Sequence, residues 1–233
     1  MRSLYTAPPG RPAHAGPGSI IAVAVALVVA AGAGQARANE HWFPSNCVPQ
    51  PNSQYVAAFH QLYAAGLIDL RNPIHFDFTS CNPPPPLPGL PQSHTFGSVV
   101  RCQISTNGGA TYQNHQAPAQ CTVRMTNLGT IGDRTIFDTE MLQLDLSGGT
   151  LPPNVRIRES PTLASTGRTT MRPGPGGGVY IDSFFDVFTE LSLDNGASWM
   201  PSDNGSGRVE MDILSATPAK GSTWGLIKSL YRR

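Results

Sequence analysis

The sequence predicts a mainly β protein, an antiparallel β-sandwich with one N-terminal helix. Gly and Pro are the two strongest biases in its composition, at 24 and 22 of 233 residues, and such a composition indicates many turns. From Phe96 onward, short segments of alternating apolar and polar residues are separated by Gly- and Pro-rich stretches. Strands of this kind bury one face each, which favours two packed antiparallel sheets.

The chain begins with a segment that we expect to be removed on export. Arg2 and Arg11 precede an apolar run at residues 20–31, and Ala36-Arg37-Ala38 forms an A-x-A cleavage pattern, so residues 1–38 are interpreted as a signal peptide. The apolar run is shorter than the roughly 20 residues that span a bilayer. The mature protein is therefore expected to be secreted or held at the cell surface without spanning a membrane. A retained membrane anchor is the alternative.

The mature chain has the size and charge of one ordinary extracellular domain. About 195 residues remain, enough for a single domain with a substantial core. Without the signal peptide, 13 basic residues stand against 15 acidic ones, which does not suggest binding to nucleic acid.

Residues 39–81 are predicted to hold the helix and a first strand. Asn52 or Ser53 is a candidate N-cap, and Gly66 a candidate end. The helical spacing rests on Tyr55, Phe59, Leu62 and Tyr63. Residues 67–79 then alternate with period two and are expected to be extended.

The remaining segments complete the predicted domain. Residues 82–93 are Pro-rich and are interpreted as a polyproline connector, with a recognition role as the alternative. Residues 94–214 are expected to form the sandwich and to pack with residues 39–81 as one domain. Residues 215–233 form a C-terminal tail, interpreted either as a sorting tag or as a terminal helix that closes the core.

All four cysteines lie in the mature chain, and export favours disulfides. Three pairings are open. We favour Cys47–Cys81 and Cys102–Cys121, because the second pair flanks a hairpin. A zinc site is not expected, since no spacing is C-x2-C.

Two octapeptides predict a special kind of β-hairpin. The second, residues 192–199, reads Ser-x-Asp-x-Gly-x-Ser-Trp, and residues 105–112 repeat the pattern with Asn for Asp and Tyr for Trp. A short acidic or amide side chain can accept backbone N–H groups of its own turn, and Gly tolerates a positive φ. The turn-forming residues are Ser105, Asn107, Gly109 and Tyr112, and Ser192, Asp194, Gly196 and Trp199.

The spacing resembles the Asp-box, a hairpin found in sialidases and other secreted carbohydrate-active proteins away from the catalytic site. Sialidase-type Asp-boxes imply a β-propeller, which needs at least four four-stranded blades. The seven or eight strands expected here cannot build one. The boxes are therefore interpreted as structural turns.

The segment at residues 181–194, Ile-Asp-Ser-Phe-Phe-Asp-Val-Phe-Thr-Glu-Leu-Ser-Leu-Asp, resembles a group of uncharacterised exported bacterial proteins. Those proteins often carry a C-terminal sorting tail. The resemblance implies export and brings no activity or catalytic residue.

The same segment supplies the candidate ligand site. In an extended strand, Asp182, Asp186 and Glu190 lie on one face, interleaved with Phe184 and Phe188. Carboxylates could hold Ca²⁺, and rings beside them could stack on sugars. The alternative is a solvated or partly covered face without a ligand.

We expect a secreted or cell-surface structural or binding protein without enzymatic activity, because no G-x-S-x-G elbow or paired catalytic carboxylates can be recognised. The partner could be a cell-surface glycan or a protein. A Ca²⁺- or carbohydrate-binding module is the first alternative, and a glycan hydrolase is the second.

Overall fold

The computed structural model describes residues 40–214, and about 60% of them lie in strands. The mainly β prediction is confirmed. The predicted signal peptide at residues 1–38 and the predicted tail at residues 215–233 lie outside the described residues. The strands are β1 (His41–Phe43), β2 (Ser53–Val56), β3 (His60–Tyr63), β4 (Ile68–Phe76), β5 (Pro91–Ser105), β6 (Gln113–Ile131), β7 (Arg134–Ser147), β8 (Arg156–Glu159), β9 (Ser165–Pro173), β10 (Val179–Val187), β11 (Thr189–Ser192), β12 (Met200–Pro201) and β13 (Gly207–Ile213).

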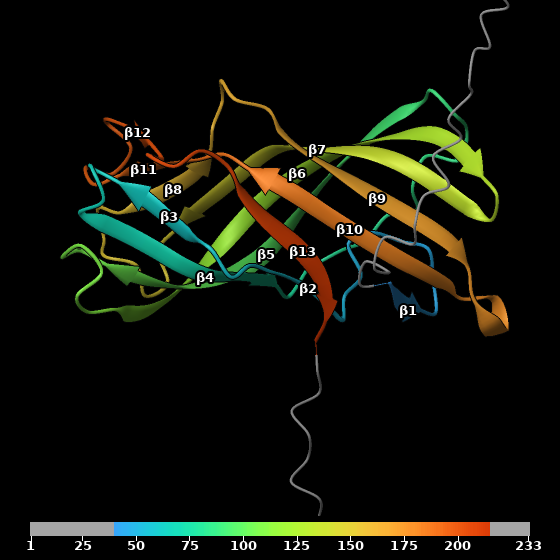
Figure 1. Cartoon of the computed structure of the whole chain (residues 1–233), viewed down its shortest axis with the longest axis horizontal. Coiled ribbons are helices and arrows are strands. Elements are labelled where there is room, and N and C mark those ends of the chain that lie inside the picture. Colours follow the sequence, from blue (N-terminus) through green and yellow to red (C-terminus); the bar gives the residue numbers. More distant parts are fainter. Residues whose placement is uncertain (1–39, 215–233) are drawn as a thin grey trace, which may run out of the picture. The chain divides into compact units, whose positions relative to one another are not determined.

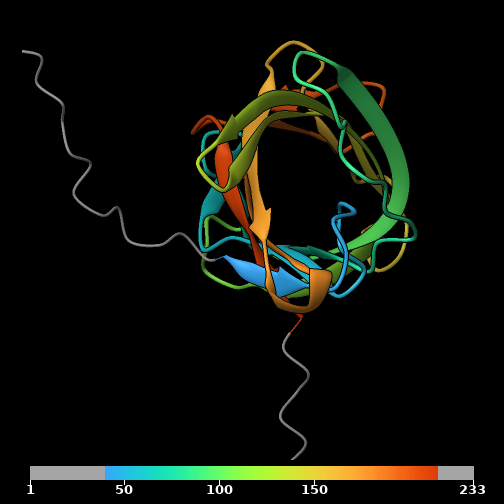
Figure 2. The same ribbon diagram turned by 90° about the vertical axis from the view of Figure 1, so that its right-hand side faces the viewer.

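The strands close into an eight-stranded antiparallel barrel (Figures 1 and 2). Its closed ring runs β2, β4, β5, β6, β7, β9, β10 and β13, and β13 pairs again with β2. The short strands β3, β8, β11 and β12 extend the wall at one end, each next to a barrel strand or to one another. Strand β1 pairs with β10 at the other end.

The predicted sandwich is wrong. Consecutive segments of the chain pair with each other all the way round, and the last barrel strand returns to the first, so one sheet closes on itself. Strands β5, β6 and β7 are 15, 19 and 14 residues long, and strands of that length twist and tilt enough to close a barrel. Barrels and sandwiches both bury one face of every strand, so alternation does not distinguish them.

The predicted N-terminal helix is also wrong. Its residues form β2 and β3, and the described residues contain only a single 3₁₀ turn, η1 (Pro175–Gly177). The buried residues are Ser53 and Tyr55 in β2, then Gln61 and Tyr63 in β3, which is a period of two within each strand. Pairing with β4 and β13 fills the backbone hydrogen bonds and overrides a helical spacing that only four side chains supported.

Two parts of the barrel wall repeat the same pairings. The first lies in β4 and β5, and the second in β8 and β11. In the first, Arg71 pairs with Gln103; in the second, Arg158 pairs with Glu190, and each residue lies 87 positions after its counterpart. The Gly108 N–H bonds the Leu67 carbonyl as the Asn195 N–H bonds the Asn154 carbonyl, again 87 positions on. The repeat therefore includes the strand before each box strand as well as the box itself.

The two box hairpins lie at the same end of the barrel, which we call the box end (Figure 1, left). One hairpin joins β5 to β6 and the other joins β11 to β12. At the opposite end, which we call the covered end, residues 44–50 and 79–90 lie at one side of the barrel opening (Figure 2), and we call these two segments the cover. The Pro-rich segment is thus part of the barrel's cover.

Only one of the two predicted disulfides is present. Cys47 and Cys81 are bonded, as predicted, and join the two segments of the cover. Cys102 and Cys121 are free and buried, so their predicted bond is wrong. In the β5–β6 ladder Cys102 pairs with His115, whereas Cys121 pairs with Phe96. The cysteines are six residue steps apart along the strands, a distance of about 20 Å.

Candidate ligand-binding site

The barrel interior contains a cavity at the covered end, of about 50 Å³. We call it the covered-end cavity. Most of its wall is apolar, because the inward residues that all eight barrel strands contribute are mostly large hydrophobic side chains or small polar ones. Its wall residues within the barrel include Tyr55, His75, Phe96, Cys121, Val123, Met125, Thr139, Met141, Thr169, Phe185 and Val209.

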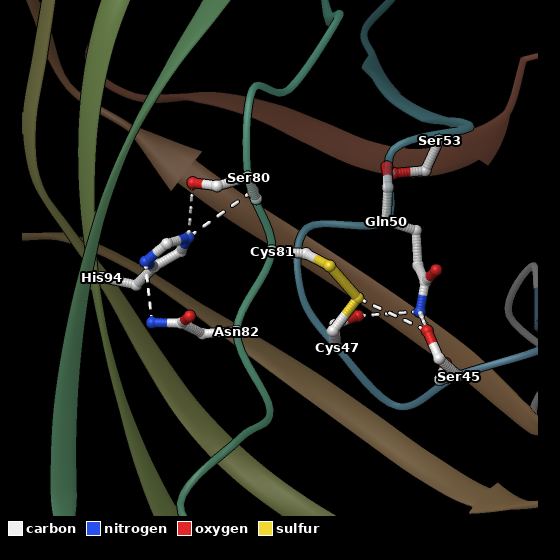
Figure 3. The surroundings of a disulfide bond; sticks show 8 residues. All are labelled: Ser45, Cys47, Gln50, Ser53, Ser80, Cys81, Asn82 and His94. Carbon is white, nitrogen blue, oxygen red and sulfur yellow. Dashed lines mark hydrogen bonds between the residues drawn. A yellow bond between two sulfur atoms is a disulfide. The ribbon is translucent and has the colours of Figure 1, made fainter.

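The cover over this cavity is held by contacts between residues far apart in the sequence (Figure 3). Beside the Cys47–Cys81 bond, Val48 and Asn82 exchange two backbone hydrogen bonds of 2.8 and 3.1 Å. The Asn82 amide donates to His94 Nδ1 at 2.9 Å. The Asn127 amide donates to the Pro85 carbonyl at 2.9 Å. The cover is therefore tied both within itself and to β5 and β6.

A larger open bowl of about 650 Å³ lies on the other side of the cover. Pro83, Pro84, Pro85 and Gln92 line both the bowl and the covered-end cavity. The Pro-rich segment is thus the partition between the two spaces. Proline has no N–H, so this partition presents few polar groups to either side.

A chain of hydroxyl groups crosses the cavity wall. The Tyr55 hydroxyl donates to Ser183 Oγ at 2.9 Å, and Ser183 Oγ lies 2.8 Å from Thr169 Oγ1. Burial raises the pKa of Tyr55 to about 12, so the phenol stays protonated and uncharged.

His75 is the only imidazole buried deep in the barrel wall among the described residues, and it is neutral. Its Nε2 lies 2.6 Å from Ser98 Oγ, and its ring packs edge-on against Phe78. Burial lowers the pKa of His75 to about 4, because a charged ring would lose its hydration without gaining a counter-ion. The cavity therefore carries no fixed charge at neutral pH from this residue.

Thr139 contributes the one unsatisfied hydroxyl of the cavity wall. The residue is 4% exposed, and its Oγ1 is buried without a hydrogen-bond partner. Its neighbour across the ladder is Gly167, whose missing side chain leaves room beside this oxygen. A Cβ at Gly167 would lie 2.9 Å from Thr139 Oγ1 and 2.0 Å from the Phe184 carbonyl oxygen. Gly167 is therefore required for this close approach of strands.

The predicted acidic row does lie along β10 and β11, but its carboxylates do not converge. Asp186 is paired with Arg208 by contacts of 2.9 and 2.7 Å, which lower the pKa of that carboxyl. Glu190 is paired with Arg158 at 3.0 and 2.7 Å. Burial raises the pKa of Asp182, and Asp182 is about 13 Å along the strand from Asp186.

No group of three or more His, Cys, Asp or Glu side chains within residues 40–214 is arranged to hold a metal ion. The predicted Ca²⁺ site thus lacks the convergent oxygen ligands that calcium needs. The same described range contains no helix with the length and apolar character needed to cross a membrane.

The two boxes form the same turn, bond for bond. Gly109 N–H donates to Ser105 Oγ at 2.9 Å and Thr111 N–H to Asn107 Oδ1 at 2.9 Å. In the second box Gly196 N–H donates to Ser192 Oγ at 2.8 Å, and Ser198 N–H donates to Asp194 Oδ1 at 2.8 Å. These bonds satisfy the backbone where the chain reverses, so the boxes act as structural turns.

The aromatic residue that ends each box is covered by an arginine. Arg71 lies over the Tyr112 ring at 3.4 Å, and Arg158 lies over the Trp199 ring at 4.0 Å. Arg208 covers Phe184 in the same way, at 4.1 Å. One face of each of these rings is therefore already occupied, which leaves less surface for a sugar to stack on.

Sequence reasoning missed the interior site. Residues 67–79 are predicted to alternate with period two, but the β4–β5 register shifts between Arg71 and Ile74, and His75 lies inside. The Asn-Pro pair at residues 72–73 was the available signal for that shift. Nothing in the sequence distinguishes Thr139 from an ordinary strand threonine.

Comparisons with known proteins identify no relative: no family model, no curated protein and no solved structure matches the chain.

Proposed function

We propose that this chain is an exported binding protein that holds a small, uncharged and largely apolar molecule in the covered-end cavity, with an oxygen of the ligand at Thr139. The observation that carries the proposal is the buried, unpartnered hydroxyl of Thr139, a residue that lines this mostly apolar cavity. Leaving a buried hydroxyl without a partner costs about 1 to 3 kcal/mol. A ligand oxygen that meets it removes this cost.

The barrel supports a binding role because of its size. Eight strands enclose an interior that is either filled by side chains or wide enough for one small ligand. Here the interior retains a cavity next to a bowl, separated by a proline partition. No Lys, Arg, Asp or Glu lines the cavity, so an uncharged ligand is favoured.

Export is supported by the Cys47–Cys81 bond, because structural disulfides persist in oxidising compartments. Together with the cleavage pattern at residues 36–38, it favours a secreted or surface-held protein. A role without catalysis is supported by the arginine partners of Asp186 and Glu190, which compensate carboxylates that a hydrolase would need free.

Methionine methyl groups offer a direct test. In protein labelled with ¹³C at the Met methyls, Met125 and Met141 report on the cavity wall, whereas Met200 lies in β12 at the box end. Titration with 1-hexanol is expected to shift the Met125 and Met141 signals saturably and to leave Met200 unchanged.

Two matched threonine variants complete the experiment. Thr139→Val is expected to weaken 1-hexanol binding about fivefold to tenfold, the value of one hydrogen bond. Thr166→Val, on the exposed face of β9, is expected to bind like the wild type. Unmoved Met125 and Met141 signals, or equal affinities in the two variants, would refute the proposal.

A further inference from the structure

Two further cavities continue the covered-end cavity along the barrel. The middle cavity, of about 70 Å³, includes Leu144, Leu146 and Val187 in its wall. The box-end cavity, of about 100 Å³, includes Ile104, Val155 and Leu191. Their order follows from the residues that they share.

Three residues line both the covered-end and the middle cavities: His75, Met141 and Val209. Three others line both the middle and the box-end cavities: Tyr63, Leu70 and Ile157. The covered-end and box-end cavities share no wall residue. The three spaces therefore form one row, with single layers of side chains between them.

The size of each cavity argues against a compact ligand. An apolar cavity of about 150 Å³ is what holds a benzene molecule. The three cavities, at about 50, 70 and 100 Å³, are each smaller than that. A molecule larger than the few heavy atoms that one cavity admits must be narrow and must extend through more than one of them.

The side chains that separate adjacent cavities can move aside to admit a ligand. Met141 has a flexible, unbranched side chain that adapts to irregular space, and no charged side chain stands in either partition. The Tyr63 hydroxyl is bonded to Thr189 Oγ1 at 2.6 Å, so its polar end already has a partner. None of the three cavities is lined by Lys, Arg, Asp or Glu.

We infer that the ligand is an unbranched alkyl chain with an uncharged oxygen at its head, of the long-chain alcohol class. The head lies at Thr139 and the chain extends through the middle cavity toward the box end. This inference rests on the proposed function and adds the shape and charge of the ligand. It predicts that affinity depends on chain length and that a carboxylate head is rejected.

The test is a series of 1-alkanols from 1-butanol to 1-dodecanol, titrated against the wild-type protein. Burial of one CH₂ contributes about 0.8 kcal/mol, so affinity is expected to rise about fourfold per carbon. The methyl signal of Ile157, which lines the middle and box-end cavities, is expected to shift with 1-dodecanol and not with 1-butanol. Dodecanoate is expected to bind at least tenfold more weakly than 1-dodecanol.

A matched pair of leucines on β7 tests where the alkyl chain of the ligand lies. Leu144 lines the middle cavity, whereas Leu142 faces outward and is 41% exposed. Leu144→Phe is expected to leave 1-butanol affinity unchanged and to abolish the gain for longer alcohols. Leu142→Phe is expected to show the same rise in affinity with chain length as the wild type. If Leu144→Phe does not fold, the affinities of the alcohol series and the Ile157 methyl signal in the wild type still test whether the alkyl chain extends beyond the covered-end cavity.

The outcomes separate the two proposals. If short alcohols bind in a Thr139-dependent way but affinity stops rising after the first few carbons, the alkyl-chain inference is overturned and the proposed function stands. Stronger binding of dodecanoate than of 1-dodecanol overturns the uncharged head. If no alcohol of any length moves Met125 or Met141, both proposals are overturned.

Discussion

The two ends of the barrel are stabilised in different ways. At the box end, most bonds of each turn join residues at most four positions apart, such as Ser192 to Gly196 and Asp194 to Ser198, and a few longer-range bonds add to them. At the covered end, the contacts join distant residues: Cys47 with Cys81, and Pro85 with Asn127. The cavity at the covered end is lined by Thr139, whose buried hydroxyl has no partner, whereas the cavity at the box end is larger and has no such group among the described residues. The end assembled from distant segments is therefore the end that offers a ligand an unpartnered hydroxyl.

The largest expected effect comes from removing the covered-end bond. Cys47 and Cys81 are 34 residues apart, and closing a loop of that length stabilises the fold by about 4 kcal/mol in the chain-entropy account. The double variant Cys47→Ser/Cys81→Ser is expected to lose about that amount in urea unfolding. Dithiothreitol should reproduce the loss in the wild type and leave the variant unaffected. A variant as stable as the wild type would show that the disulfide bond does not stabilise the fold.

His75 makes the covered end sensitive to mild acid. Its pKa is lowered from 6.5 to about 4, so the folded state binds fewer protons than the unfolded state in this window. The stabilisation is present above pH 6.5 and is lost as pH falls toward 4, by about 3 kcal/mol. Urea unfolding at several pH values is expected to show this slope. It should be reduced in His75→Gln. A slope in that variant equal to the wild-type slope would assign the effect to other groups.

The box end is expected to respond to loss of a single serine hydroxyl. Ser192 Oγ is buried and accepts from the N–H groups of Asp194 and Gly196. Ser192→Ala leaves these donors without their partner and is expected to cost about 1 to 3 kcal/mol. Ser105→Ala, at the equivalent position, should cost about the same. Thermal unfolding of the two variants measures how alike the two box turns are, and a large difference between them would contradict equivalent turns.

Thr139→Val is expected to stabilise the unliganded protein, whereas the serine variants of the two boxes are expected to be less stable than the wild type. Valine has the same shape without the unpartnered hydroxyl, so the free energy of unfolding should rise by about 1 kcal/mol. The same variant weakens ligand binding, and this opposition of stability and affinity is characteristic of a binding residue. Chemical denaturation without ligand is the measurement. A destabilised variant would indicate that Thr139 Oγ1 has a structural partner.

The smallest effect distinguishes the two boxes in strong acid. Hydrogen bonds from Ser198 and Ser192 lower the pKa of Asp194 from 3.8 to about 2. The contribution of Asp194 is therefore present above pH 4 and is lost as pH falls toward 2. Asp194→Asn should flatten the stability profile in that window, and Asn107→Asp should steepen it by giving the first box the same carboxyl. Unchanged acid profiles in both variants would show that the charge of the box residue does not matter.

Local chemistry allowed the boxes and most strands from Phe96 onward to be predicted. The Cys47–Cys81 bond is favoured from the sequence only as the companion of the Cys102–Cys121 pairing, which is wrong. Ser192, Asp194 and Gly196 fix their turn through bonds within eight residues, so the turn depends little on the rest of the molecule. Cys102 and Cys121 could not be assigned in the same way. Whether they bond depends on the register of β5 against β6, and that register is set by the whole ladder.

The sequence by itself determined the mainly β character, the box turns and the period of most strands from Phe96 onward, because these depend on side chains close together in the chain. Tertiary structure decided that residues 52–66 are strands, that the sheet closes into a barrel, and that Thr139 and His75 face a common interior. Those features depend on which strand lies beside which. Closure requires the last strand to find the first, and the free energy of that pairing is not contained in any local segment.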